Sequence, residues 1–260
     1  MKRYISLWLC LAMLTTQISL ESRFGAAMFT FGKLLRFVFF LLFIILLGVK
    51  TNVIGNYSLW QMVLFYLSFN FIDTTAQLFL REVYRFRNYV VNGFFDYILI
   101  KPMSPLFRCL FGGADILDIF LLFISISALV ITITHISGIT IQGIVFYILL
   151  LANGLLIALA CHIIVLGIGI VTTEVDNTLW LYRDLTQMGR FPIDIYKEPI
   201  RSFLTFVVPV GIMITFPAKA LMGLLTVSAV CMSLILGVLF FTVSLYVWTY
   251  ALRRYTSASS

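Results

Sequence analysis

Charged residues within apolar stretches are the side chains of this sequence most able to do chemistry. Charges within a membrane segment are costly and usually mark a pathway or a paired site. Asp73 lies in one apolar stretch, and a later cluster consists of Glu174, Asp176, Arg183 and Asp184. Asp73 is therefore a candidate pathway residue, and the four residues of the cluster would face a polar pathway or a partner chain if their segment crosses the membrane. The alternative for Asp73 is a structural, partly hydrated residue bonded to Thr74 or Gln77.

Motifs of common enzyme and metal chemistries do not occur in this sequence. The Gly32-Lys33 pair is followed by Leu34 and is not part of a nucleotide-binding loop. His135 and His162 are isolated, and the four cysteines form no CxxC pair, which argues against a zinc site or a disulfide framework. We therefore expect a chain without enzymatic activity that binds no metal and no cofactor of its own.

The composition requires a membrane around these residues. The 260 residues are 62% hydrophobic and 11% charged, whereas soluble domains are roughly 45–50% apolar and about 25% charged. A soluble fold would lack its polar shell, and 25 Phe, 12 Tyr and 4 Trp residues exclude a disordered chain. The sequence therefore predicts an all-α polytopic membrane protein.

Basic residues predict the orientation of the chain and account for its net charge of +7. They form one group before the first long apolar stretch, one in the middle and one at the end. These groups are Lys2, Arg3, Arg23, Lys33 and Arg36; Arg81, Arg85, Arg87, Lys101 and Arg108; and Arg253 and Arg254. By the positive-inside rule they lie on the cytoplasmic face, with both termini. The lipid bilayer then explains the charge, and no nucleic-acid partner is expected.

Apolar stretches of about 20 residues predict the membrane spans. Five of them lie at about 31–50, 57–80, 114–135, 141–171 and 221–252. Since both termini lie on one face, a further crossing is needed before the last span. Hydropathy alone favours 202–218, although this segment is interrupted by Pro209 and Pro217. The other candidate, 174–189, contains the charged cluster.

The first 30 residues allow two interpretations. Lys2 and Arg3 followed by an apolar run resemble a signal peptide, yet 15–23 offers no small-x-small cleavage site. We expect an uncleaved helix, residues 1–30, lying in the cytoplasmic interface.

A basic loop, residues 81–112, combines charges with many large apolar residues. Its prolines, Pro102 and Pro105, prevent one continuous helix. Three interpretations remain open: an amphipathic helix on the bilayer, a helix that docks into a cytosolic partner, or ordinary interface packing. The candidate docking residues are Arg87, Asp96, Tyr97, Lys101, Pro102, Ser104, Pro105 and Arg108.

Several short segments carry a resemblance in their order and spacing. They are Asp96 to Phe107 in the basic loop, Arg190-Phe191-Pro192 with Tyr196, Phe206-Val207-Val208-Pro209-Val210, Pro217-Ala218, and Arg254-Tyr255-Thr256-Ser257-Ala258. With these segments the chain resembles type-2 ABC exporter permeases, and most closely the small six-span permease family of uncharacterised bacterial ABC transporters.

The resemblance implies a topology. It makes 174–189 the fifth span and 190–218 an extracellular re-entrant hairpin, called the proline hairpin below. Residues of this hairpin singled out by the resemblance are Arg190, Pro192, Tyr196, Pro199, Pro209 and Pro217.

The resemblance also implies a function, that of a transmembrane permease subunit of an ATP-driven ABC export system in the cytoplasmic (inner) membrane. Cytosolic ATPase subunits, which bind ATP and Mg, would dock on the basic loop, and a second permease chain, identical or different, would complete the pathway. The alternatives are a secondary transporter, for which 1–130 and 131–260 show no matching broken helices, and a non-transporting scaffold. The transported substrate stays open between an amphipathic drug, a lipid-linked molecule and a peptide.

Overall fold

The protein is described by a computed structural model that covers residues 2–51, 57–172 and 175–256. The structure is 85% helical, and the described residues form no strand. The predicted all-α class is therefore confirmed.

Within the described residues, five helices are long and apolar enough to cross a membrane, judged by length and composition. They are α1 (Lys2–Glu21), α2 (Arg23–Thr51), α3 (Leu59–Leu80) with the short helices that continue it, α8 (Ile141–Thr172) and α12 (Val227–Arg254). A bent helix pair, 200–207 and 211–221, makes a sixth if it is counted as one span. These helices confirm a polytopic membrane protein. The predicted span at 114–135 appears as α7 (Asp118–Thr134), which is apolar but shorter.

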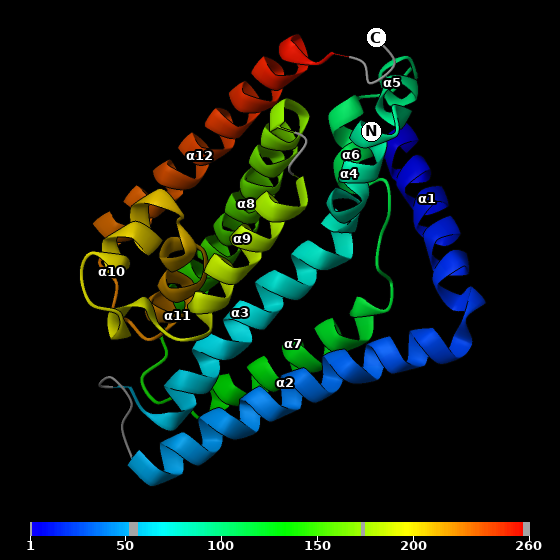
Figure 1. Ribbon diagram of the computed structural model, residues 1–260. Helices are drawn as coiled ribbons and strands as arrows, with labels where there is room; N and C mark the ends of the chain where they lie inside the picture. Colours follow the sequence, from blue (N-terminus) through cyan, green and yellow to red (C-terminus); the bar gives the residue numbers. More distant parts are fainter. Residues whose placement is uncertain (1, 52–56, 173–174, 257–260) are drawn as a thin grey trace.

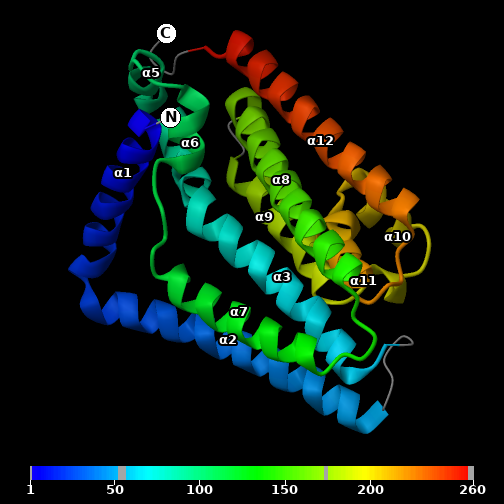
Figure 2. The same cartoon turned by 180° about the vertical axis from the view of Figure 1, so that it is seen from behind.

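The N-terminal segment bends earlier than the sequence predicts. Helix α1 ends at Glu21 and α2 begins at Arg23, so the break lies at Ser22 and not near residue 30. The Ser22 Oγ accepts a hydrogen bond from the backbone N of Gly25 (3.2 Å), which satisfies one of the free donors at the start of α2. Figures 1 and 2 show the two helices meeting at a steep angle, with α2 running beside α7.

Helices α3 and α8 form the core of the molecule. Most residues along both helices are buried, because other helices surround them. Met62, Leu64 and Phe65 of α3 are fully buried, as is Leu166 of α8. Helix α12 packs along α8, where the side chain of Asn153 donates a hydrogen bond to the carbonyl of Ser233 (2.9 Å).

Helix α9 (Val175–Gln187) runs back along α8 and continues into the 3₁₀ turn η2 (Met188–Arg190). It coincides with the predicted fifth span, but it has 13 residues and does not meet the length and apolarity of the five spanning helices. That α9 crosses the membrane therefore stays a prediction.

The proline hairpin follows α9 as a series of short helices. Its first part contains η3 (Ile193–Ile195) and α10 (Ile200–Ser202). Its two arms are α10 with the π-helical turn η4 (Phe203–Val207), and the π-helical turn η5 (Gly211–Thr215) with α11 (Phe216–Leu221). The arms are bent by 78° around the segment that contains Pro209.

The basic loop folds into η1 (Arg81–Arg85), α4 (Phe86–Val91), α5 (Phe94–Leu99) and α6 (Pro105–Phe111). These helices lie at the same end of the molecule as the start of α1 and the end of α12, whereas α10 and α11 lie toward the other end (Figures 1 and 2).

Candidate functional site

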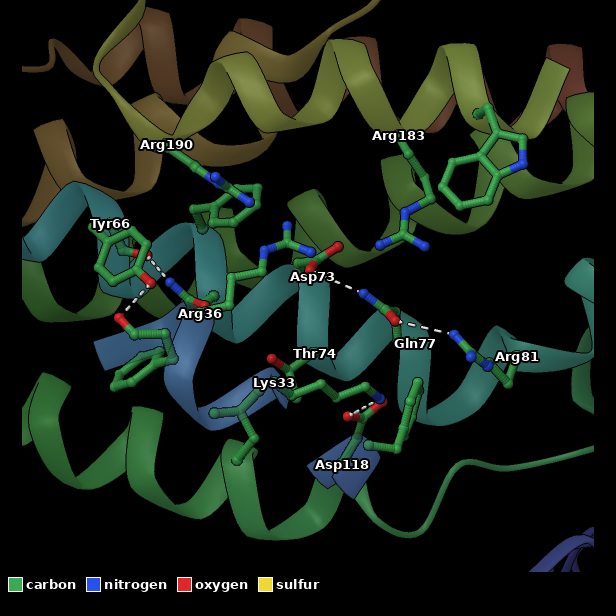
Figure 3. Close-up of a pocket in the computed structure, with 16 residues that line it drawn as sticks. Lys33, Arg36, Tyr66, Asp73, Thr74, Gln77, Arg81, Asp118, Arg183 and Arg190 are labelled. Carbon is green, nitrogen blue, oxygen red and sulfur yellow. Dashed lines mark hydrogen bonds and ion pairs between the residues drawn. The ribbon is translucent and has the colours of Figure 1, made fainter. Parts of the chain in front are cut away.

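A cavity of about 290 Å³ lies among α2, α3, α7 and α9 (Figure 3). Its charged lining residues are Lys33, Arg36, Asp73, Arg81, Asp118, Arg183 and Arg190. Five of these seven are cations. Aromatic and aliphatic side chains, including Phe29, Phe37, Phe69, Leu121 and Trp180, complete the walls. The cavity is therefore both positively charged and amphipathic.

Asp73 belongs to a polar row along α3. Gln77 donates to the Oδ2 of Asp73 (3.0 Å), and Arg81 donates to the Oε1 of Gln77 (3.3 Å). The three residues are four apart and share one helix face. The structure thus contains the Gln77 hydrogen bond proposed for a structural Asp73, and it also places Asp73 in the cavity.

Lys33 neutralises two carboxylates at the wall formed by α7. Its Nζ lies 2.5 Å from the Oδ1 of Asp118 and 3.1 Å from the Oδ2 of Asp115. Arg81 Nε lies 3.8 Å from the same Asp115 oxygen. The sequence pattern missed this group, because Lys33 was assigned only to the basic residues that set orientation.

Arg183 and Arg190 lie against aromatic rings on the opposite wall (Figure 3). The Arg183 guanidinium is 5.3 Å from the ring centre of Trp180 and 5.5 Å from that of Tyr84. That of Arg190 is 4.8 Å from Phe40 and 5.4 Å from Phe69. Arg190, the first residue of the predicted hairpin, also lines the cavity.

The remaining pathway candidates lie elsewhere. Asp176 is half-exposed and lies 3.5 Å from Arg87 of the basic loop (Oδ2 to Nε), and Asp184 is exposed and does not line the cavity. Glu174 lies outside the described residues. Of the five predicted pathway residues, the structure brings together Asp73 and Arg183.

Glu82 is the centre of the basic loop, although no sequence pattern singled it out. Its side chain is 1% exposed. The Oε1 accepts from Arg108 Nη1 (2.5 Å) and from the Tyr89 hydroxyl (2.6 Å), and Arg85 Nη1 is 3.3 Å from Oε2. Burial lowers the pKa of Arg108, but the charge and hydrogen bond of Glu82 outweigh it, so the pKa lies above its ordinary value. Glu82 therefore joins η1, α4 and α6.

Helix α5 has a buried side and an exposed side. Phe95 is fully buried, with its ring centre 5.3 Å from that of Phe86, 5.0 Å from Tyr255 and 6.4 Å from Trp248. The exposed side carries Phe94, Tyr97 and Ile100, which are 52%, 62% and 78% exposed. Of the predicted docking residues, Tyr97 therefore lies on this exposed ridge.

The C-terminal segment contacts α5 through Tyr255, which lies beside Asp96. Burial, with the hydrogen bond and charge of Asp96, raises the pKa of Tyr255 to about 12. Tyr255 is thus neutral at physiological pH and can pack on Phe95.

The remaining predicted residues of the loop position it against α1. Arg3 donates to the carbonyl of Pro102 (3.2 Å), and the backbone N of Ser104 donates to the Tyr4 hydroxyl (3.4 Å). Ser104 also caps α6, since its Oγ accepts from the backbone N of Phe107 (3.4 Å), and Pro105 occupies the first turn of that helix. Lys101 is exposed.

Asp194 joins the proline hairpin to Tyr57, just before α3. Its Oδ2 accepts from the Tyr57 hydroxyl (2.8 Å) and lies 2.6 Å from Lys219 Nζ, and its Oδ1 accepts from Arg201 (2.9 Å). Burial raises the pKa of Asp194, but hydrogen bonds from Lys219 and Tyr57 and the nearby positive charges lower it overall. One carboxylate thus holds three segments together.

The prolines predicted for the hairpin lie at the starts of its short helices and at its bend. Pro192 precedes η3, Pro199 precedes α10, Pro209 lies at the bend and Pro217 is in the first turn of α11. Tyr196 donates from its hydroxyl to the carbonyl of Met188 (2.8 Å), which ties the hairpin to the end of α9.

In the described part of the chain, no three His, Cys, Asp or Glu side chains lie close enough together to bind a metal ion. The expectation of a chain without its own cofactor stays a prediction.

Comparison with known proteins identifies the family. Residues 34–259 match the family model described as ABC-2 family transporter protein. Neither the curated proteins nor the solved structures gave a match. The family match covers most of the chain, including α3, the basic loop, α8, α9, the hairpin and α12. The chain therefore belongs to the ABC-2 transporter family and is a membrane permease component of an ABC transporter.

Proposed function

We propose that this chain is the transmembrane subunit of an ATP-driven export system and that separate cytosolic ATPase subunits drive it through α5. The observation that carries the proposal is the ridge of Phe94, Tyr97 and Ile100, called the α5 ridge below. These exposed side chains stand on a helix whose other side is anchored in the core. An apolar ridge on a helix fits a groove in a partner protein.

The anchoring of α5 supports a mechanical role. Phe95 contacts Phe86 of α4 and Trp248 of α12, so a displacement of α5 is transmitted to two parts of the bundle. The buried Glu82 group holds η1, α4 and α6 together at the end of α3.

A second connection leads from the loop to the cavity wall. Arg87 of α4 pairs with Asp176 at the start of α9, and α9 carries Arg183 into the cavity. Exposed ion pairs of this kind stabilise by about 0.2–1 kcal/mol. Such a pair is weak enough to break and reform as α5 moves.

The complete system requires parts that this chain lacks. ATP and Mg bind the partner ATPase, and this chain has no enzymatic activity of its own. A second permease chain, of the same or a related sequence, supplies the other half of the pathway. Both termini and the basic loop lie on the cytoplasmic side of the inner membrane, and the proline hairpin forms part of the outer gate.

The test is purification of the chain from its native membrane, followed by an assay of Mg-ATP hydrolysis in the eluate. We expect an ATPase to co-purify, and the Phe94→Ser/Tyr97→Ser/Ile100→Ser variant to lose most of it without loss of membrane insertion. Ile141→Ser is the matched control, because Ile141 is 83% exposed at the start of α8, far from α5. Asp96→Lys and the pair Pro102→Ala/Pro105→Ala should weaken ATPase association as well.

Two results would refute the proposal. Purification without any ATPase would favour a secondary transporter or a scaffold. Undiminished ATPase association of the triple variant would exclude the α5 ridge as the docking surface.

A further inference from the structure

The cavity contains an excess of positive charge that the described residues do not neutralise. Lys33 forms ion pairs with Asp115 and Asp118, and Arg81 lies within ion-pair distance of Asp115. Arg36, Arg183 and Arg190 also line the cavity, and none of the three forms an ion pair with any described residue. Among the described lining residues, the carboxylate left to them is that of Asp73, whose Oδ2 already accepts from Gln77.

Aromatic rings hold two of these guanidinium groups, those of Arg183 and Arg190. A ring attracts a cation to its face, and a guanidinium that lies against a ring keeps N–H groups for a ligand. The Nε of Arg190 is buried and has no hydrogen-bond partner among the described residues. Buried donors normally have partners, so this atom indicates a missing acceptor.

We infer that the cavity binds the anionic head, a phosphate or a carboxylate, of an amphipathic molecule. Planar guanidinium groups bind such oxygens in pairs of parallel hydrogen bonds. Phe29, Phe37 and Leu121 line the same cavity and provide an apolar surface for the rest of the ligand. Figure 3 shows Arg183 and Arg190 extending from one wall toward Arg36 and Asp73.

Binding of an amphipathic anion in the cavity does not depend on the proposed function. That the bound anion is the transported substrate does rest on the proposed function, and it would narrow the substrate class to amphipathic anions and exclude cationic drugs.

The test is binding of dioctanoyl phosphatidic acid to the purified chain in a neutral detergent, measured beside uncharged dioctanoylglycerol and inorganic phosphate. Phosphatidic acid is expected to bind about tenfold to a hundredfold more tightly than the diacylglycerol, as lost charge-assisted hydrogen bonds imply. Arg36→Gln/Arg183→Gln/Arg190→Gln should remove this preference. Arg253→Gln, an exposed cation outside the cavity, should keep it.

Single variants keep the test decisive if the triple variant does not fold. Arg190→Lys preserves the charge but not the paired donors, so it should weaken phosphatidic acid binding and leave diacylglycerol binding unchanged. Equal affinity of the wild-type chain for both lipids, or undiminished preference in the folded variants, overturns the anion site. Inorganic phosphate that binds as tightly as the lipid overturns the amphipathic class and identifies a site for free anions.

This experiment separates the two proposals because it uses the chain without an ATPase. A chain that binds the lipid but never co-purifies with an ATPase refutes the proposed function alone. A chain that co-purifies with an ATPase but shows no preference for phosphatidic acid refutes the anion site alone.

Discussion

Asp194 and Lys219 form an ion pair of 2.6 Å between Oδ2 and Nζ, and this pair joins the start of the proline hairpin to its second arm. The same carboxylate accepts hydrogen bonds from the hydroxyl of Tyr57, just before α3, and from the Arg201 guanidinium of the first arm. Because proline-rich segments have few backbone hydrogen bonds to keep their shape, these side-chain contacts supply what the backbone lacks.

Asp194→Asn is expected to destabilise the chain by about 1–3 kcal/mol, the usual cost when partly buried polar groups lose a partner. The readout is the melting temperature of the purified protein in detergent. Glu198→Gln is the matched control, because Glu198 is exposed in the same hairpin and its hydrogen bonds to described residues go to Ser202. Equal melting temperatures for the two variants would show that Asp194 does not hold the hairpin.

The pH dependence of stability should report the same carboxylate. The pKa of Asp194 is lowered in the folded chain, below the value of about 3.9 for an unfolded aspartate. Its contribution is therefore fully present above that value and is lost as the pH falls through the lower folded pKa. We expect the difference in melting temperature between wild type and Asp194→Asn to shrink as the pH is lowered from about 6 toward 3. A constant difference across this range would contradict the assigned charge interaction.

Glu82→Gln should be the most damaging conservative change in the basic loop. It leaves Arg108 with a partly buried charge and no carboxylate, and removal of one partner from a buried pair costs about 3–5 kcal/mol. Glu82→Leu/Arg108→Leu should cost less, since no charge then stays buried. Melting temperature and detergent-soluble yield of both variants provide the measurement. If the double variant is no more stable than Glu82→Gln, burial of an unpaired charge is not the cause.

The membrane class and most helices follow from the sequence, because apolar length alone decides which segments can cross a bilayer. The cavity does not follow, since its charges come from four separate helices and hydropathy does not tell which side of each helix faces inward. Lys33 and Arg190 show this clearly. Both were assigned to the ends of segments, and both point into the same space from different walls.

Helical periodicity likewise does not tell which charged residues of α9 line the cavity. Asp176 and Arg183 are seven residues apart and share a face of α9, yet only Arg183 reaches the cavity, because Asp176 pairs with Arg87 of a helix distant in sequence. At the bend between α1 and α2, the Ser22 hydroxyl caps the start of α2. This serine is visible in the sequence, but it stands among apolar residues and was not recognised as a cap.

Gly154 permits α8 to approach the proline hairpin. A Cβ at this position would lie 2.5 Å from the carbonyl oxygen of Met213 and 2.9 Å from the Cδ1 of Ile72. The backbone oxygen cannot move aside easily, so Gly154→Ala should destabilise by about 1–3 kcal/mol. Gly32→Ala in α2 has open space and should be neutral or slightly stabilising through its higher helix propensity. Similar melting temperatures for the two alanine variants would contradict the close approach.

The sidedness of the proline hairpin can be decided with single cysteines at Lys197 and Lys101. Both side chains are exposed, one in the hairpin and one in the basic loop. If α9 is the fifth span, three crossings separate the two positions, and they lie on opposite faces of the membrane. If the bent pair 200–207 and 211–221 is the fifth span, two crossings separate them, and they lie on the same face.

Labelling with an impermeant maleimide in right-side-out and inverted membrane vesicles distinguishes these topologies. The background replaces Cys10 and Cys231 by Ser, because both are exposed, whereas Cys109 and Cys161 are buried. We expect Lys197→Cys to react in right-side-out vesicles and Lys101→Cys in inverted ones. Reaction of both cysteines from one side would make the bent pair the fifth span and remove the hairpin from the outer gate. The bent pair would then complete the even number of crossings, and α9 would lie on the membrane surface with its charges in water.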